Sequence, residues 1–76
     1  MLIFYTVNPE PEINAKAFIV RIFKEQDSHP RCLKTVCFPV TDPSRLQKAR
    51  NQACKFGRLS VKELMDKELR NEGFRD

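Results

Sequence analysis

The hydrophobic pattern of this chain changes its period at Thr41-Asp42-Pro43, and this change constrains the fold more than any other feature. Before it, short segments rich in β-branched and aromatic residues alternate between two faces, which is typical of strands. After it, apolar residues recur every three or four positions, as in amphipathic helices. The chain is therefore predicted to be α+β, with a sheet followed by helices.

Three strands are predicted before Thr41, over residues 2–7, 17–25 and 31–40. Pro9 and Pro11 cannot donate hydrogen bonds to a ladder, so they are predicted to stop the first strand. The turn at 26–30 joins the second and third strands, which we expect to form an antiparallel hairpin within a three-stranded antiparallel sheet.

The two faces of these strands differ in character. In the second strand, Phe18, Val20 and Ile22 share the face expected to be core, and Ile19, Arg21 and Phe23 share the other. In the third strand the expected core residues are Val36, Phe38 and Val40, with Lys34 near their entry, and those pointing away are Arg31, Leu33, Thr35 and Cys37.

Ile19, Phe23 and Leu33 then form an apolar group on the sheet face away from the helices. Exposed apolar patches often mark protein interfaces, so we expect a docked protein partner or a homodimer formed through the sheet. The alternative is a strand register shifted by one residue, which would exchange the two faces.

Two helices are predicted after the change of period. Thr41-Asp42-Pro43 combines a capping side chain with a proline in the first turn, and Gly57 is predicted to end the first helix. Ser60 and Glu63 form a capping box that predicts the start of a second helix. The buried stripe of the first helix is Leu46, Ala49, Ala53 and Phe56. The predicted order is β-β-β-α-α in a single domain spanning residues 1–76.

The composition narrows the class of protein. With 41% hydrophobic and 32% charged residues the chain is globular rather than disordered. No apolar run approaches the roughly 20 residues of a membrane span. The start of the chain lacks the basic segment of a signal peptide, and an odd number of cysteines, 3, argues against a disulfide scaffold. We therefore expect a cytoplasmic protein without membrane contact.

The sequence predicts neither an enzyme nor a bound cofactor. A chain of 76 residues has a thin core with little room for an enclosed active site. His29 is the one histidine, and the two glycines, Gly57 and Gly73, form no phosphate-binding loop.

A metal site is also not predicted, although His29, Cys32, Cys37 and Cys54 could supply four zinc ligands. Cys32 and Cys37 are an odd number of residues apart in one strand, so they are expected on opposite faces. Such a pair cannot close one tetrahedral site.

The basic residues are concentrated in the middle of the chain. Residues 15–59 hold ten bases and three acids, for a charge of +7, whereas residues 1–14 carry −2 and residues 60–76 carry −1. A basic segment of this kind favours nucleic acid or an acidic protein surface as partner. Helix residues Arg45, Lys48 and Lys55 lie at helical spacing beside the buried stripe, and Arg50 and Arg58 add to the region.

The stretch from Phe18 to Phe56 resembles the small DNA-binding domain of phage integrases and plant ethylene-response factors. The resemblance rests on F-I-V-R-I-F, a turn, K-T-V-C-F-P-V and a helix with Ala49 and Ala53 toward the sheet, and it covers about half the chain. It implies a three-stranded sheet that reads the major groove. The DNA-facing residues that it implies are Arg21, Lys24, Arg31, Lys34 and Thr35.

Two functions therefore remain open at the level of sequence. One is a small non-enzymatic nucleic-acid-binding protein, an accessory factor of a phage or mobile element. The other is a phage-type inhibitor that docks through its sheet on a larger protein complex, such as a nucleic-acid enzyme. The first would use the basic residues, and the second would use the apolar group with charges at its rim.

Overall fold

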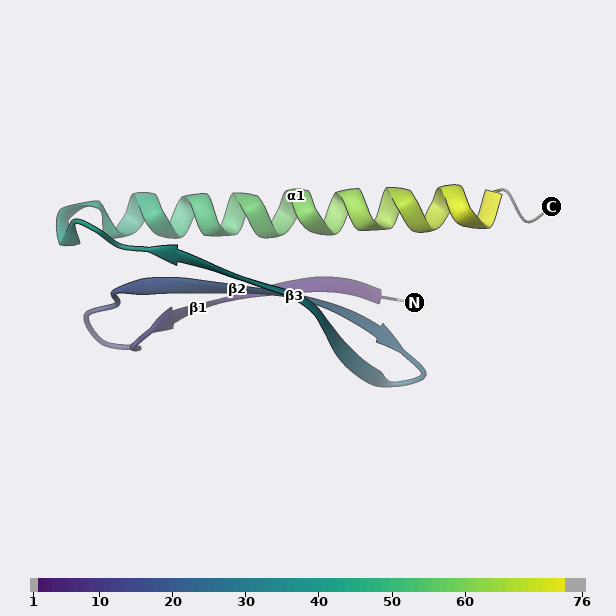
Figure 1. The fold of residues 1–76 in the computed structure, drawn as a ribbon, viewed down its shortest axis with the longest axis horizontal. Coiled ribbons are helices and arrows are strands. Elements are labelled where there is room, and N and C mark those ends of the chain that lie inside the picture. The colour runs from purple at the N-terminus through teal and green to yellow at the C-terminus, as the bar shows by residue number, and fades with distance from the viewer. Residues whose placement is uncertain (1, 74–76) are drawn as a thin grey trace.

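A computed structural model describes the backbone of residues 2–73 and the side chains of residues 2–68. Strands β1 (Leu2–Glu10), β2 (Ala17–Gln26) and β3 (His29–Pro39) form an antiparallel sheet in the order β1-β2-β3. A short 3-10 turn, η1 (Pro43–Arg45), leads into one long helix, α1 (Leu46–Gly73), which lies along one side of the sheet (Figure 1). The α+β fold and its three-stranded sheet are confirmed, but the prediction of two helices is wrong.

β1 is longer than predicted because a proline is accommodated inside it. Pro9 lies opposite Phe18, and the strand continues to Glu10. β1 is at the edge of the sheet, where the missing N–H of a proline costs no ladder hydrogen bond if it faces outward. The strand ends directly before Pro11, within the predicted two-proline segment, but Pro9 itself does not stop it.

The β2–β3 hairpin closes through a two-residue turn at Asp27 and Ser28. Both have positive φ angles, 56° and 67°. Positive φ at both central positions is the signature of a type I′ turn, whose twist matches that of the flanking strands. The hairpin is therefore tight, and its far end bends away from α1 (Figure 1).

A β-bulge interrupts the regular pairing of β2 with β3. Ile22 lies opposite Lys34, but the next residue, Phe23, lies opposite Cys32, so Leu33 is left without a direct partner. An extra residue in one strand exchanges the two faces of everything beyond it. The predicted alternation therefore holds from Lys34 onward and fails from Leu33 back to the turn.

The helical segment begins where the sequence predicts, but α1 continues through Gly57, where the sequence predicts the end of the first helix. The Asp42 side chain caps η1, which leads into α1, by accepting a hydrogen bond from the Ser44 N–H at 3.0 Å. Gly57 is buried inside the helix and faces Tyr5 of β1, and a Cβ at this position would lie 2.7 Å from the Cγ of Tyr5. Gly57 is thus a close-packing residue rather than a helix stop, and Ser60 is a mid-helix residue rather than a cap.

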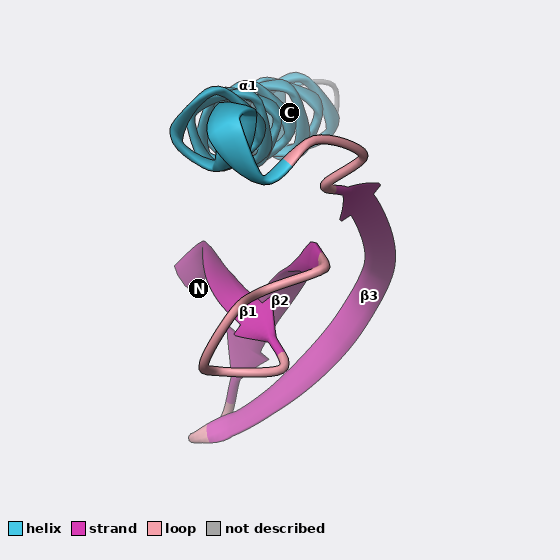
Figure 2. Ribbon diagram, turned by 90° about the vertical axis from the view of Figure 1, so that its left-hand side faces the viewer, coloured by secondary structure: helices cyan, strands magenta, loops and turns pink. Residues whose placement is uncertain are grey.

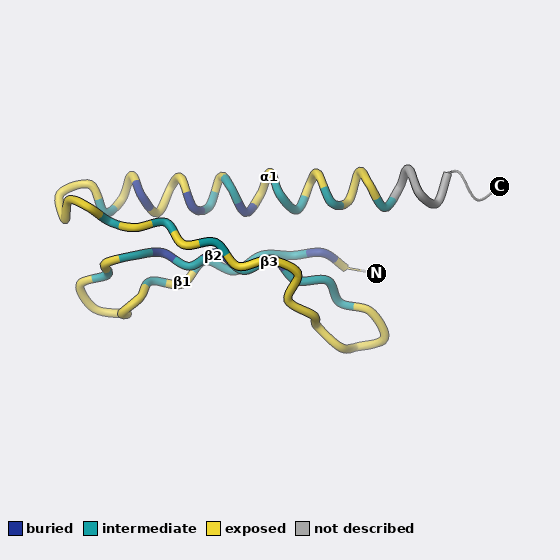
Figure 3. The backbone as a smooth tube through the Cα atoms, in the orientation of Figure 1, coloured by how far each residue is buried: buried dark blue, intermediate teal, exposed yellow. Residues whose placement is uncertain are grey.

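The core lies between the sheet and the inner face of α1 (Figure 3). On the sheet side it is formed by Ile3, Phe18, Val20 and Ile22. On the helix side Ala49 and Ala53 are buried, and Leu46 and Phe56 pack against them, so the predicted stripe is confirmed. Within residues 2–73, no helix combines the length and apolar character needed to span a membrane.

Candidate binding surfaces

The sheet has one face toward α1 and one open face, because α1 covers a single side (Figure 2). The strand pairings arrange the open face in rows of directly opposed residues, which share a face in antiparallel sheets. From one end to the other, these rows are Asn8–Ile19–Cys37, Thr6–Arg21–Thr35, Phe4–Phe23–Cys32 and Leu2–Glu25–Pro30. The predicted face of Ile19, Arg21 and Phe23 is therefore confirmed, and the alternative of a shifted register for β2 is wrong.

An apolar group occupies the open face, and we call it the Phe4–Phe23 patch. The two phenyl rings stack with centroids 5.2 Å apart and planes 16° apart. Ile19 is partly buried on the same face, two rows away beyond Arg21, and Leu2 is 52% exposed at the end of the face. Phe4 and Leu2 take the place that the sequence assigned to Leu33.

Leu33 does not belong to this patch. It lies in the bulge and lines a hollow of about 360 Å³ with Lys24, His29 and Arg31 at the far end of the hairpin. The prediction that Ile19, Phe23 and Leu33 form one surface is wrong in its third member. The bulge is the cause, since it gives Cys32 the position opposite Phe23.

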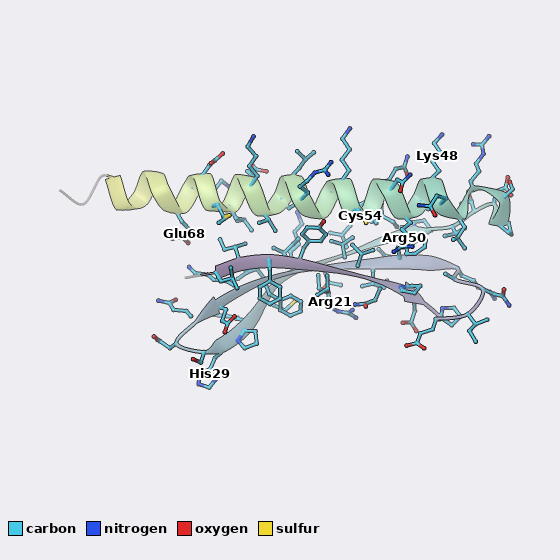
Figure 4. All side chains as sticks on the ribbon, turned by 180° about the vertical axis from the view of Figure 1, so that it is seen from behind. Arg21, His29, Lys48, Arg50, Cys54 and Glu68 are labelled. Carbon is cyan, nitrogen blue, oxygen red and sulfur yellow. The ribbon has the colours of Figure 1, made fainter. Side chains whose placement is uncertain are left out.

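The five residues that the family resemblance implies as DNA-facing do not share a face either. Arg21 and Thr35 lie on the open face, where Figure 4 shows Arg21 on the side away from α1. The other face, which points toward α1, holds the remaining three. Lys34 pairs with Ile22, and Lys24 pairs with Arg31 beyond the bulge.

Two of these lysines are engaged with α1. The Nζ of Lys24 donates a hydrogen bond to the Oε1 of Glu68 at 2.8 Å, forming an ion pair between partly buried side chains. The Nζ of Lys34 lies 5.4 Å from the centroid of the Phe56 ring, within the range of a cation–π contact. Both lysines therefore help to hold the sheet against the helix.

The outer face of α1 gathers the remaining predicted bases. Lys48 and Lys55 are turned about 100–160° around the helix from Ala49 and Ala53, and Figure 4 shows Lys48 pointing away from the sheet. Arg45 precedes them in η1. All three are exposed, and the same surface includes the exposed side chains of Arg58 and Lys62. We call these five residues the basic helix face.

Lys62 was missed because the sequence was divided into two helices near Gly57. In one continuous helix, Lys48, Lys55 and Lys62 repeat every seven residues. Seven residues make nearly two turns and advance about 10.5 Å, so the three ammonium groups align in a stripe about 21 Å long. The seven-residue spacing was the signal that could have identified Lys62.

The stretch that carries this face is free of acidic residues. Between Pro43 and Lys62 the sequence has six bases and no aspartate or glutamate. Arg50 is the sixth base, and it points toward the sheet, where it lines a hollow of about 340 Å³ with Glu12 (Figure 4). The first acidic residue on this side of α1 is Asp66, one turn after Lys62, so the uncompensated positive charge is concentrated between Arg45 and Arg58.

The helix N-terminus itself is already occupied by a carboxylate. The pKa of Asp42 is lowered because its side chain accepts hydrogen bonds from the backbone N–H and then the hydroxyl of Ser44. The charged Asp42 therefore satisfies the Ser44 N–H at the start of η1 and adds a negative charge at this end of the helical segment.

The cysteines lie differently from the prediction. The bulge brings Cys32 onto the open face with Cys37, and the Sγ of Cys32 lies 3.5 Å from the Oγ1 of Thr35. The prediction that Cys32 and Cys37 occupy opposite faces is wrong. Across the described part of the chain, no group of three or more His, Cys, Asp or Glu side chains is arranged to hold a metal ion.

Comparisons with known proteins add no family assignment: no family model, curated protein or solved structure matches this chain.

Proposed function

We propose that this protein is a non-enzymatic nucleic-acid-binding protein and that it binds phosphates through the basic helix face. The observation that carries the proposal is the alignment of exposed lysines on one side of α1, in a stretch without acidic residues. Lysine and arginine side chains that neutralise phosphates release condensed counterions, which drives association at low salt.

The geometry of α1 supports a helix, rather than the sheet, as the main contact. α1 forms a layer of its own above the sheet, and none of the described strands or turns covers its outer side (Figures 1 and 2). Among the strand residues 2–10, 17–26 and 29–39, the open sheet face has one base, Arg21. The neighbouring row is apolar, with the stacked rings of Phe4 and Phe23. A phosphate backbone would find more positive charge on α1.

Contacts of this kind favour affinity over sequence specificity. Lysine ammonium groups act as point charges toward phosphate oxygens, which are the same in every sequence. We therefore expect the protein to bind duplexes of different sequence with similar affinity, and binding to weaken steeply as salt rises.

The test is fluorescence anisotropy with a labelled duplex, titrated from about 50 mM to 200 mM salt. The variant Lys48→Glu/Lys55→Glu should lower the affinity at least tenfold and reduce the slope of log K against log salt by about two. The control, Lys16→Glu/Lys67→Glu, changes the net charge equally at exposed sites outside the basic helix face and should bind within about twofold of wild type.

An equal loss in the two variants would reduce the effect to net charge and refute a specific role for α1. Undetectable binding of wild type to duplex and to single strands at low salt would refute the proposed function as a whole.

A further inference from the structure

We infer that the open sheet face binds a second copy of the same chain, forming a symmetric dimer with β2 antiparallel to its counterpart. The first observation is that a sheet covered on one side carries the Phe4–Phe23 patch on its other side. The second is the position of the charges around that patch, which selects a second copy over other occupants.

Arg21 and Glu25 lie on the open face at equal distances from Phe23, one on each side along β2. Both are partly buried. Across the described side chains, neither Arg21 nor Glu25 has an ion-pair partner within its own chain. Both still contact solvent in the single chain, but a partner that covers the open face would bury them, and a charge buried without an opposite charge is costly.

A second copy supplies both opposite charges at once. Consider a two-fold axis that lies between two stacked sheets, at right angles to β2, and passes over Phe23. This operation brings Arg21 of one chain over Glu25 of the other, and Glu25 over Arg21. Stacked sheets are about 10 Å apart, a distance that an arginine and a glutamate side chain can span together.

The central row of the open face fits the same axis, whereas the row Asn8–Ile19–Cys37 is placed opposite the turn at Asp27 and lies outside the sheet-to-sheet contact. The central row, Phe4–Phe23–Cys32, lies along the axis, so the stacked rings of the two copies meet each other and form an apolar centre. Leu2, exposed in the single chain, comes over Thr6 of the second copy. The arrangement is an apolar centre with one ion pair on each side, which is the usual anatomy of a protein interface.

The dimer does not depend on the proposed function. It uses the sheet face opposite to α1, so the basic helix faces of the two chains would point outward in opposite directions.

The experiment is sedimentation velocity of the purified full chain over a range of concentrations, with circular dichroism to check folding. Wild type should sediment as a discrete dimer. Arg21→Glu and Glu25→Arg should each raise the dimer dissociation constant at least tenfold, since each places like charges opposite one another. The double variant Arg21→Glu/Glu25→Arg should restore it to within about threefold of wild type.

Thiol cross-linking tests the position of the axis. The cysteine on the axial row is Cys32, whereas Cys37 lies two rows away, about 14 Å from the axis. With a short bis-maleimide, a variant that keeps Cys32 alone should yield cross-linked dimer, and a variant that keeps Cys37 alone should not.

Three results would overturn the inference. A wild-type chain that stays monomeric at high concentration would leave the open face to a different protein partner. A dimer insensitive to either single charge reversal would exclude the Arg21–Glu25 pairing. If the single variants fold but do not dimerise, and the double variant does not restore the dimer, the symmetric register would be excluded.

Discussion

The substitution Gly57→Ala tests whether Gly57 is needed for the close packing of α1 on the sheet. Helix propensity and the contact with the sheet predict opposite effects of this substitution on stability. Gly57 has an ordinary helical φ, because none of the described glycines has a positive φ. Judged by helix propensity alone, alanine should therefore stabilise the protein by about 1 kcal/mol. The neighbouring Tyr5 ring reverses this expectation.

The size of the effect follows from the contact. An alanine Cβ would lie 2.7 Å from Cγ and 2.9 Å from Cε2 of Tyr5, whereas carbon atoms ordinarily pack at about 3.5–4.0 Å. Relieving the contact requires a movement of about 1 Å by the ring or by α1, and overpacking of this kind typically costs about 1–3 kcal/mol. After the gain in propensity, we expect a net loss of about 1 kcal/mol in the free energy of unfolding.

Urea denaturation followed by circular dichroism measures this loss. The control is the same substitution in a Tyr5→Val background, where the ring is gone and strand propensity is kept. There Gly57→Ala should increase the free energy of unfolding by about 1 kcal/mol, so the two backgrounds differ in sign. If Gly57→Ala stabilises the wild-type background as well, the close approach of α1 to Tyr5 is refuted.

Three further predictions concern the helix and the hairpin. Ser60→Ala should raise the free energy of unfolding by up to about 0.5 kcal/mol, because serine is mid-helix; a loss near 1 kcal/mol in urea denaturation would instead indicate a cap. Ser28→Gly should raise it by about 1 kcal/mol, because glycine adopts the positive φ of 67° without strain; an unchanged melting temperature would argue against the type I′ turn. The pKa of Asp42 is lower in the folded chain than its ordinary value of 3.8, so its stabilisation is present above that pH and lost as pH falls through the folded pKa. The difference in melting temperature between wild type and Asp42→Asn should therefore narrow on acidification below pH 3.8, and a constant difference would show that the Ser44 contact is not charge-dependent.

The features that sequence predicted correctly are those determined by short-range periodicity and capping. The faces of β2 follow from strict alternation around Val20, and the start of α1 follows from Asp42 and Pro43. Ala49 and Ala53 mark the inner side of the helix because their spacing matches its period. Part of the candidate site could be predicted in the same way. Helical periodicity places Lys48 and Lys55 away from the buried side that Ala49 and Ala53 mark.

The features that sequence missed depend on residues distant in the chain. Gly57 resembles a helix stop until Tyr5 of β1 is seen to occupy the space where a side chain would be. Pro9 resembles a strand stop until its strand is known to be an edge. The bulge at Leu33 removed that residue from the predicted apolar group and moved Arg31 to the face that Lys24 shares with Ile22. Local sequence thus determined the elements and their inner faces, because propensity, periodicity and capping act within a few residues. Tertiary structure decided which side chains share a surface, because pairing register and close packing are set by contacts between elements.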